Sequence, residues 1–356
     1  MKIIRRPTRV IYVGNVPVGG NNPIVIQSMT KANPSNFKAI LEEINNLIDA
    51  GCELVRVAIP DSKSLEVFHS LVREVEIPLI ADIHFNWKLA IAAIEAGASG
   101  IRINPGNIGG INKFREILKN LTQAKQVALR IGINAGSLEK ELLLKYKHPQ
   151  AKALVESAIL YSNIAEEAGF LNYKISLKSS DVLTTIKAYR MISALTSAPL
   201  HLGITEAGSE LSGIVKSSIG IGSLLLEGIG DTIRVSLSAP SKEEVSVAKE
   251  ILRSLHLYNK GVEVISCPTC GRCEYDLFSI VKKIKELTSN INTPYLKVAI
   301  MGCVVNGPGE ASEADIGVAG GKGKGVLFKK GKIIRTITTE EIIPVIMEEI
   351  NRHSVK

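Results

Sequence analysis

The sequence has few aromatic residues and no long apolar run. Phe, Trp and Tyr make up 4% of the 356 residues, with a single tryptophan, Trp87. Proteins that bind single-stranded nucleic acid stack bases on exposed rings, so this composition argues against that class. A membrane helix needs about 20 consecutive apolar residues, and no segment approaches that length. The basic N-terminus lacks a signal-type apolar segment and a cleavage site, so we expect a cytoplasmic protein with no nucleic-acid or membrane partner.

Acidic residues are outnumbered by basic ones, 35 against 43, which gives a formal net charge of +8. The basic residues are spread along the chain, and a modest excess of this kind suits an anionic ligand or an acidic partner protein. Apolar residues form 45% of the chain, which is ample for a packed core. The length is typical of two domains.

From residue 24 to about residue 255, short β-branched runs alternate with longer amphipathic stretches. Most of the runs are almost wholly apolar, as expected for parallel strands buried on both faces. The amphipathic stretches predict helices, with Ser62 and Ser241 as N-caps of two of them. The predicted strands are Ile24–Gln27, Leu54–Val57, Leu79–Ala81, Gly100–Ile103, Ala128–Ile133, Tyr173–Ser176, Leu200–Gly203 and Thr232–Val235.

Eight strand–helix repeats predict an α/β fold, a (β/α)₈ TIM-like barrel over residues 1–255. An open, doubly wound sheet is the alternative, but such sheets rarely contain eight such even repeats. Thr8–Val13 and Val16–Pro17, with turn glycines around them, predict a small hairpin at the floor of the barrel. After the polar linker His256–Lys260 the pattern changes to mixed strands and helices, which predicts a separate α+β domain over residues 256–356.

Polar or charged residues follow or end each apolar run. In a TIM-like barrel the chemistry lies at the C-terminal ends of the strands. A single arginine there is best interpreted as a solvated loop residue, but several cations on one rim repel one another unless an anion binds. We therefore predict a small phosphorylated substrate. The residues concerned are Gln27, Ser28, Arg56, Asp82, His84, Arg102, Asn104, Arg130, Asn134, Lys178, Thr205, Glu206, Arg234 and Ser236.

Three of these residues are candidates for acid–base or orienting roles. Asp82 and His84 could equally brace the third loop of the barrel. Glu206 follows the seventh strand among cations and is a candidate proton donor or acceptor.

The cysteines are clustered and odd in number. Cys267, Cys270 and Cys273 have the C-x₂-C-x₂-C spacing of ferredoxin-type loops, and Cys303 follows later in the same domain. In a cytoplasmic chain this pattern indicates a metal site rather than disulfides. The spacing fits a structural zinc site about as well as an iron–sulfur cluster.

The sequence around these cysteines resembles one family closely. Cys267-Pro-Thr-Cys270-Gly-Arg and Gly302-Cys303-Val-Val-Asn-Gly-Pro-Gly-Glu310 are similar to the cluster-binding signatures of the 4-hydroxy-3-methylbut-2-enyl diphosphate synthase family of the non-mevalonate isoprenoid pathway. The resemblance extends to barrel segments such as Ala81-Asp82-Ile-His84-Phe85 and Leu202-Gly-Ile-Thr205-Glu206, and covers essentially the whole chain. It matches the short, two-domain bacterial form.

The resemblance implies an iron–sulfur oxidoreductase with a [4Fe–4S] cluster bound by Cys267, Cys270, Cys303 and Glu310. Cys273 departs from the family pattern, and we interpret it as an unused neighbour. A carboxylate holds iron less strongly than a thiolate, which leaves one iron exchangeable. The implied reaction opens and dehydroxylates 2-C-methyl-D-erythritol 2,4-cyclodiphosphate to (E)-4-hydroxy-3-methylbut-2-enyl diphosphate.

For the implied reaction we assign roles to residues of the barrel, and the resemblance implies the partners. Arg56, Arg102, Arg130 and Lys178 would bind the diphosphate, assisted by Asn134, Arg234 and Ser236. Glu206 would protonate the departing hydroxyl, while Asp82 and His84 orient the ring. Flavodoxin or ferredoxin would donate electrons, and the chain would form a homodimer whose active site is shared between subunits.

Two other classes stay open from the residues alone. A non-redox barrel lyase or transferase acting on a phosphorylated substrate, with a zinc-stabilised C-terminal domain, would have the same cations and cysteines. A basic zinc-ribbon protein that binds nucleic acid is less favoured, because the chain lacks a concentrated Lys/Arg stripe.

Overall fold

The computed structural model describes residues 3–354 except 125, 148–149, 206–207, 209, 274, 290, 292, 304–308, 310 and 322. The chain divides into two compact units, Met1–Leu257 and Tyr258–Lys356. The division falls two residues after the boundary predicted from the sequence. None of the helices in the described ranges is long and apolar enough to cross a membrane.

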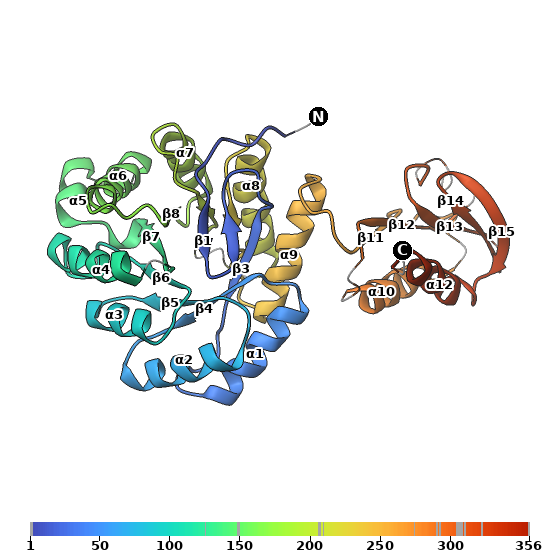
Figure 1. Ribbon diagram of the computed structural model, residues 1–356. Helices are drawn as coiled ribbons and strands as arrows, with labels where there is room; N and C mark the ends of the chain where they lie inside the picture. The colour runs from blue at the N-terminus through green and yellow to red at the C-terminus, as the bar shows by residue number, and fades with distance from the viewer. Residues whose placement is uncertain are drawn as a thin grey trace. The chain divides into compact units, whose positions relative to one another are not determined.

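The first unit is a barrel of eight parallel strands surrounded by helices (Figure 1), which confirms the predicted fold class. Its sheet has the order β8-β7-β6-β5-β4-β3-β10-β9, and a single bridge between Ile175 and Leu200 joins the two ends. The strands are β3 (Val25–Met29), β4 (Leu54–Ala58), β5 (Leu79–Ile83), β6 (Gly100–Ile103), β7 (Ala128–Asn134), β8 (Tyr173–Lys178), β9 (His201–Leu202) and β10 (Thr232–Ile233).

All the helices of this unit except α5, which has no buried residue, bury side chains against the rest of the barrel unit. In the first of them, Ile40, Ile44 and Leu47 are wholly buried, as their helical spacing requires. The helices are α1 (Phe37–Asp49), α2 (Ser62–Glu74), α3 (Trp87–Glu95), α4 (Ile111–Ala124), α5 (Lys140–Tyr146), α6 (Ala151–Glu167), α7 (Val182–Ser193), α8 (Glu210–Leu226) and α9 (Ser241–Ser254). The sequence analysis did not anticipate α5.

Both predicted serine N-caps are wrong by one residue. Asp61 caps α2, because its carboxylate accepts a 2.8 Å hydrogen bond from the Ser64 backbone N–H in a capping box. Pro240 occupies the N-cap position of α9 and forms no side-chain cap bond, so Ser241 is the first residue of that helix.

The predicted floor hairpin is confirmed. Strands β1 (Ile11–Val13) and β2 (Val16–Val18) pair antiparallel. Their buried side chains pack against the first residues of the barrel strands, among them Val25, Leu54 and Ala128. The N-terminal end of the barrel is therefore filled with apolar side chains, and the polar interior lies toward the opposite end.

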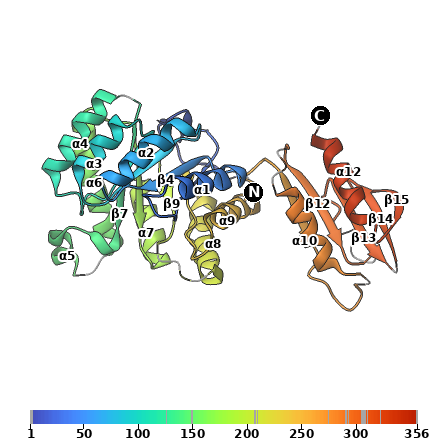
Figure 2. The same ribbon diagram turned by 90° about the horizontal axis from the view of Figure 1, so that it is seen from below.

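The second unit is an α+β domain with one mixed five-stranded sheet in the order β11-β12-β13-β14-β15. Strands β11, β12 and β13 run parallel, and the last two pairings are antiparallel. Helices α10 and α12 pack beside each other and against the sheet (Figure 2). The elements are β11 (Val262–Ser266), α10 (Leu277–Thr288), β12 (Leu296–Met301), β13 (Ile316–Gly321), β14 (Lys324–Lys329), β15 (Lys332–Thr338) and α12 (Ile342–Ser354).

Candidate functional site

Three of the predicted substrate-binding arginines lie inside the barrel rather than on its rim loops. Arg56, Arg102 and Arg130 are residues of β4, β6 and β7, and their exposed fractions are 6%, 5% and 3%. Alternate residues of a strand point to the same face. The arginines share this inward face with small residues such as Gly132, where an added Cβ would lie 3.0 Å from Arg102 Nε.

Asp82 joins the arginines through its carboxylate. Its Oδ1 accepts a hydrogen bond from Arg102 Nη1 at 3.2 Å, and its Oδ2 lies 3.6 Å from Arg56 Nε and 3.3 Å from His84 Nε2. Burial alone would raise the pKa of Asp82, but Arg56 and Arg102 outweigh burial and hold it well below its usual value. The carboxylate is therefore ionised and fixes both guanidinium groups. His84 is about half exposed at the open end of the barrel.

Lys178 ends β8 and belongs to the same cluster. It is buried, and burial together with Arg130 and Arg234 lowers its pKa well below the usual value. Gly203 provides the space for this side chain, because an added Cβ there would lie 2.8 Å from Lys178 Nζ and 2.7 Å from the carbonyl oxygen of Arg234. The sequence analysis missed Gly203.

The other predicted substrate-binding residues lie at the same end of the barrel. Asn134 is in register with Lys178 and is half-buried at the end of β7. Arg234 follows β10 directly, and the half-buried Ser236 lies two residues further on. Glu206 lies outside the described residues, whereas Thr205, immediately before it, is half-buried beyond β9.

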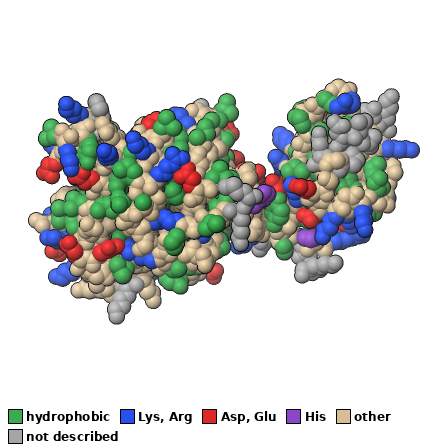
Figure 3. Space-filling model, turned by 90° about the horizontal axis from the view of Figure 1, so that it is seen from above, with side chains coloured by type: hydrophobic (Ala, Val, Ile, Leu, Met, Phe, Trp, Pro, Cys, Tyr) green, Lys and Arg blue, Asp and Glu red, His purple; other side chains and the backbone are tan. Residues whose placement is uncertain are grey.

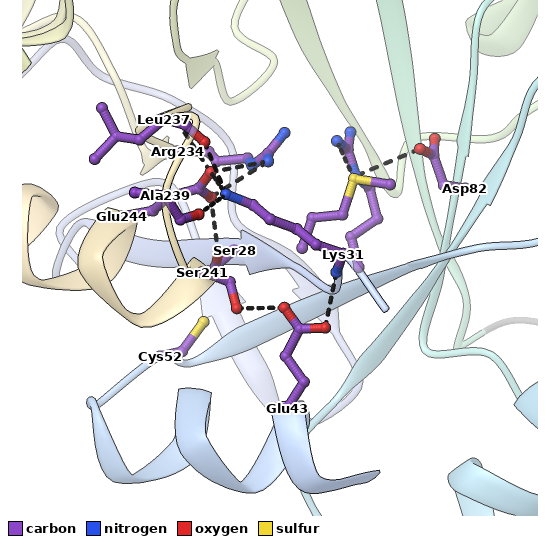
Figure 4. Close-up of polar contacts among 12 residues, drawn as sticks. Ser28, Lys31, Glu43, Cys52, Asp82, Arg234, Leu237, Ala239, Ser241 and Glu244 are labelled. Atoms are coloured by element: carbon purple, nitrogen blue, oxygen red, sulfur yellow. Dashed lines mark hydrogen bonds and ion pairs between the residues drawn. The ribbon is translucent and has the colours of Figure 1, made fainter. Parts of the chain in front are cut away.

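A second buried carboxylate, Glu244, holds Arg234 in place (Figure 4). Its oxygens lie 3.3 Å from Arg234 Nη2 and 2.8 Å from Lys31 Nζ. They also accept hydrogen bonds of 3.1 Å from Ser28 Oγ and from the Leu237 backbone N–H. The sequence analysis missed Glu244, although a glutamate beside Val245 on the apolar face of α9 was a usable signal.

Cations outnumber carboxylates among the described side chains of the barrel interior. Burial, opposed by Asp82 and aided by Arg234 and Arg102, lowers the pKa of Arg56 to about 9. Arg130 Nε and Nη1 have no hydrogen-bond partner among the described residues. Buried donors without partners are costly, so the interior is suited to an anion that accepts these bonds. The outer face of the barrel unit drawn in Figure 3 carries basic and acidic side chains interspersed.

The four clustered cysteines lie on two loops of the second unit. Cys267 follows β11, and Cys303 follows β12. Because these neighbouring strands are parallel, both loops begin at the C-terminal ends of the strands, on the same side of the domain. The Cys273 backbone N–H donates a 2.9 Å bond to the carbonyl of Cys270, which folds the C-x₂-C-x₂-C segment into a turn.

The sulfur atoms have the surroundings of metal ligands. Cys267 Sγ accepts a 3.3 Å hydrogen bond from the Gly302 backbone N–H, a donor type that favours thiolate. Burial raises the pKa of Tyr275, and Cys273, Cys267 and Cys303 raise it further, so three sulfurs lie near one ring. The Tyr275 hydroxyl donates a 2.8 Å bond to the Met301 carbonyl.

This donor set fits a thiolate-bound iron–sulfur cluster or zinc. Within the described part of the chain, no three His, Cys, Asp or Glu side chains already form a metal-binding group. Glu310, the predicted fourth ligand, lies outside that part. A Cβ added at Gly302 would lie only 2.7 Å from Cys273 Sγ, so this sulfur lies against Gly302 and beside Cys267. The Cys273 thiol also donates a 3.3 Å hydrogen bond to the Tyr275 carbonyl oxygen.

Comparison with solved structures shows the barrel fold alone. Dihydropteroate synthase from Stenotrophomonas maltophilia matches with a TM-score of 0.52 at 14% identity, over 70% of this chain and 97% of that chain. The enzyme from Yersinia pestis, in a sulfonamide complex, matches with a TM-score of 0.53 at 10% identity, over 70% of this chain and all of that chain.

Sequence comparison identifies much nearer relatives. 4-Hydroxy-3-methylbut-2-en-1-yl diphosphate synthase (flavodoxin) of Thermodesulfovibrio yellowstonii is 53% identical over 98% of this chain and 100% of the relative. The synthase of the same name from Aquifex aeolicus is 51% identical over 98% of this chain and 97% of the relative.

Two family models account for both units. The GcpE TIM-barrel domain matches residues 8–249, and the GcpE protein C-terminal domain matches residues 263–352. Together with half-identity to relatives over nearly the full length, these matches show that the chain belongs to the GcpE family of 4-hydroxy-3-methylbut-2-en-1-yl diphosphate synthases.

Proposed function

We propose that this chain converts 2-C-methyl-D-erythritol 2,4-cyclodiphosphate to (E)-4-hydroxy-3-methylbut-2-enyl diphosphate by a two-electron reduction with loss of water. The names of its full-length relatives support this reaction. The structural observation that carries the proposal is the buried cation cluster of the barrel, whose unpaired N–H groups require an anion. Neither the zinc-stabilised lyase nor the nucleic-acid-binding protein is favoured by the comparisons.

The cation cluster binds the diphosphate in this proposal. Arg56, Arg102, Arg130 and Lys178 contact phosphate oxygens, and each charge-assisted hydrogen bond contributes about 1.5–3 kcal/mol. Arg234, Asn134 and Ser236 complete the site. Because Asp82 already holds Arg56 and Arg102, and Glu244 holds Arg234, these three side chains lose little entropy when the ligand binds.

Cys267, Cys270, Cys303 and Glu310 hold a [4Fe–4S] cluster in this proposal. When bound, the cluster supplies the electrons for reduction. The Gly302 N–H bond to Cys267 Sγ stabilises the thiolate that ligation requires. Cys273 is left as a neighbour of the ligands.

Three side chains have proton or positioning roles in the proposal. Glu206 gives a proton to the departing hydroxyl oxygen. Asp82 acts through the two arginines that it fixes, and the half-exposed His84 orients the substrate ring at the open end of the barrel.

An acidic flavodoxin or ferredoxin of the cytoplasm is the proposed electron donor. The relatives carry flavodoxin in their names, and the formal charge of +8 favours docking of an acidic protein. Turnover with flavodoxin is expected to slow as salt rises, because salt screens such attraction.

A second copy of the chain is the remaining proposed partner, with the cysteine loops of one subunit serving the barrel of the other. Helix α8 carries an exposed apolar stripe, in which Leu211, Val215 and Ile219 are 75%, 47% and 52% exposed. The hollow of about 360 Å³ beside it, lined by α8 and α9, is largely apolar. Surfaces of this kind favour association.

Two experiments test the dimer. Val215→Glu with Ile219→Glu is expected to convert the dimer to a monomer in light scattering. Mixing a Cys267→Ser subunit with an Arg56→Ala subunit is expected to restore part of the activity that each variant lacks. Absence of rescue in a stable mixed dimer would show that each chain forms its own site.

The decisive test of the reaction is turnover by anaerobically reconstituted protein. With a chemical reductant and the cyclic diphosphate, we expect the linear diphosphate as product, and about four irons per chain with broad visible absorption. Colourless protein that contains one zinc and turns over no substrate would favour the lyase.

A further inference from the structure

Lys174 is a buried cation that the proposed reaction does not use. It lies in β8 and is 1% exposed, and its Nζ has no hydrogen-bond partner among the described residues. Lys174, Ser176 and Lys178 alternate along β8, so all three face the barrel interior. A fully buried lysine without a partner is rare, and its position needs an explanation.

The groups around Lys174 are mostly cationic. Arg130 on β7 is its register partner, and Arg56 on β4 acts on it across the interior. Asp231, ahead of β10, is the carboxylate that acts on it, but that side chain already pairs with Arg5 at 2.7 Å and accepts a 2.8 Å bond from the Leu200 N–H.

Two further titratable groups face the same interior. On β9, His201 Nδ1 lies 2.8 Å from Thr232 Oγ1, and its Nε2 has no partner among the described residues. Burial, and then Arg130, Lys178 and Lys174, lower the pKa of His201 well below its usual value, so the ring is neutral. Lys178 lies toward the open end of β8. Among the described residues, the carboxylate that acts on Lys174 is therefore already paired with Arg5.

We propose that Lys174 is uncharged in the free protein and takes up a proton when the diphosphate of the substrate occupies the cation cluster. Lys174 is thus a positioning residue that completes the positive charge of the site only when the ligand is present. The inference rests on the proposed function, because it requires the ligand to bind beside Arg130 and Lys178.

The electrostatics of the free and bound states agree with this. Burial and Arg130 lower the pKa of Lys174 to about 7, although Asp231 opposes them. A lysine with that pKa is only about one-tenth protonated at pH 8. A diphosphate brings opposite charge into a low-dielectric interior and favours the ammonium form. The gain or loss of this charge then depends on the ligand.

Calorimetry of ligand binding tests the inference. The cyclic diphosphate is titrated into oxidised holoenzyme at pH 8 in two buffers of different ionisation enthalpy, which gives the protons taken up per ligand bound. The phosphates of this ligand are fully ionised near neutral pH, so the uptake belongs to the protein. We expect Lys174→Met to bind the ligand with an uptake lower than that of the wild type by more than half a proton.

Lys174→Arg is the second variant. Its guanidinium stays charged in both states, so it is expected to lose the same uptake and to bind at pH 8 at least as tightly as the wild type. It also tests the inference if Lys174→Met does not fold. Lys152→Met, at an exposed position of α6, is the matched control and is expected to keep the wild-type uptake. Above neutral pH, the uptake of one proton makes the affinity of the wild type for the ligand fall by close to tenfold per pH unit. Both Lys174 variants are expected to lack this part of the pH dependence.

The outcomes separate the two proposals. If the Lys174 variants bind the ligand and take up as many protons as the wild type, Lys174 is not the acceptor and the inference is wrong, while diphosphate binding stands. If the wild type does not bind the cyclic diphosphate, the proposed function fails and the inference fails with it.

Discussion

In the barrel, the charged side chains of the site lie on strands or directly after them, and ion pairs with Asp82 and Glu244 hold Arg56, Arg102 and Arg234 in place. In the second unit, the cysteines lie on loops that follow β11 and β12. Backbone ladders fix the barrel cations before any ligand binds, whereas metal sites built from thiolates commonly gain their order from the metal. An anion site can be built in advance, while a cluster site is completed by its cofactor.

The largest expected effect tests the cysteine side of this comparison. Cys267→Ser is expected to abolish turnover and to lose most of the iron and visible absorption, because serine is a poor ligand for iron–sulfur clusters. Cys273→Ser is the matched control, with iron content near that of the wild type. Equal loss of iron in both variants would show that Cys273 is a ligand.

The next effect tests whether Asp82 holds the barrel cations in place. Asp82→Asn leaves two buried guanidinium groups without a counter-charge, so we expect the free energy of unfolding to fall by about 3–5 kcal/mol. Urea unfolding followed by the fluorescence of Trp87, which lies in the barrel unit, measures it. Glu156→Gln is the control, because its pair with Lys145 is exposed to solvent and such pairs contribute little to stability. A similar small loss for both would mean that the buried pair does not organise the site.

A smaller effect concerns the space that glycine provides. Gly203→Ala is expected to raise KM for the cyclic diphosphate about tenfold, roughly one lost hydrogen bond, because its Cβ would displace Lys178 Nζ. The same substitution made in a Lys178→Met background should add less, since only the contact with the Arg234 carbonyl oxygen remains. If the two substitutions raise KM additively, the effect of Gly203→Ala does not come from the displacement of Lys178.

The smallest expected effect is on how the stability of the barrel unit depends on pH. His201 stays neutral in the folded barrel, while in the unfolded chain it becomes charged below about pH 6.5. The unfolded state then binds more protons, so this residue makes the free energy of unfolding fall by up to about 1.4 kcal/mol per pH unit as the pH drops below that value.

His201→Asn removes this titration and is expected to flatten the dependence of Trp87-monitored unfolding between pH 6.5 and pH 5. His69→Asn, at an exposed position of α2, is the control. An unchanged slope in His201→Asn would assign the acid sensitivity to other groups.

The sequence predicted the barrel because parallel strands buried on both faces are apolar runs, and it indicated a metal site because C-x₂-C spacing is unusual. It placed Arg56, Arg102 and Arg130 toward the C-terminal ends of predicted strands, and all three lie within the observed strands. Lys174, Ser176 and Lys178 form an alternating polar pattern in β8, a signal of an inward polar face that the sequence analysis did not use.

The tertiary contacts of several residues could not be predicted from local sequence, even where the position itself was marked, as Glu244 was by the apolar face of α9. Glu244, Gly203 and His201 matter through contacts with residues distant in the chain, and no local pattern contains those contacts. The order of the sheet, which brings β10 between β3 and β9, is what creates them.

The seam where the barrel closes has a consequence for its internal motions. His201 and Leu202 pair with only Thr232 and Ile233 among the described strands, and the single bridge of Leu200 to Ile175 completes the circle. Local opening is easiest where ladder hydrogen bonds are few. Backbone amides along this seam should therefore exchange with deuterated solvent sooner than those of β5 or β7, and binding of an anion that joins Lys178 to Arg234 should slow that exchange.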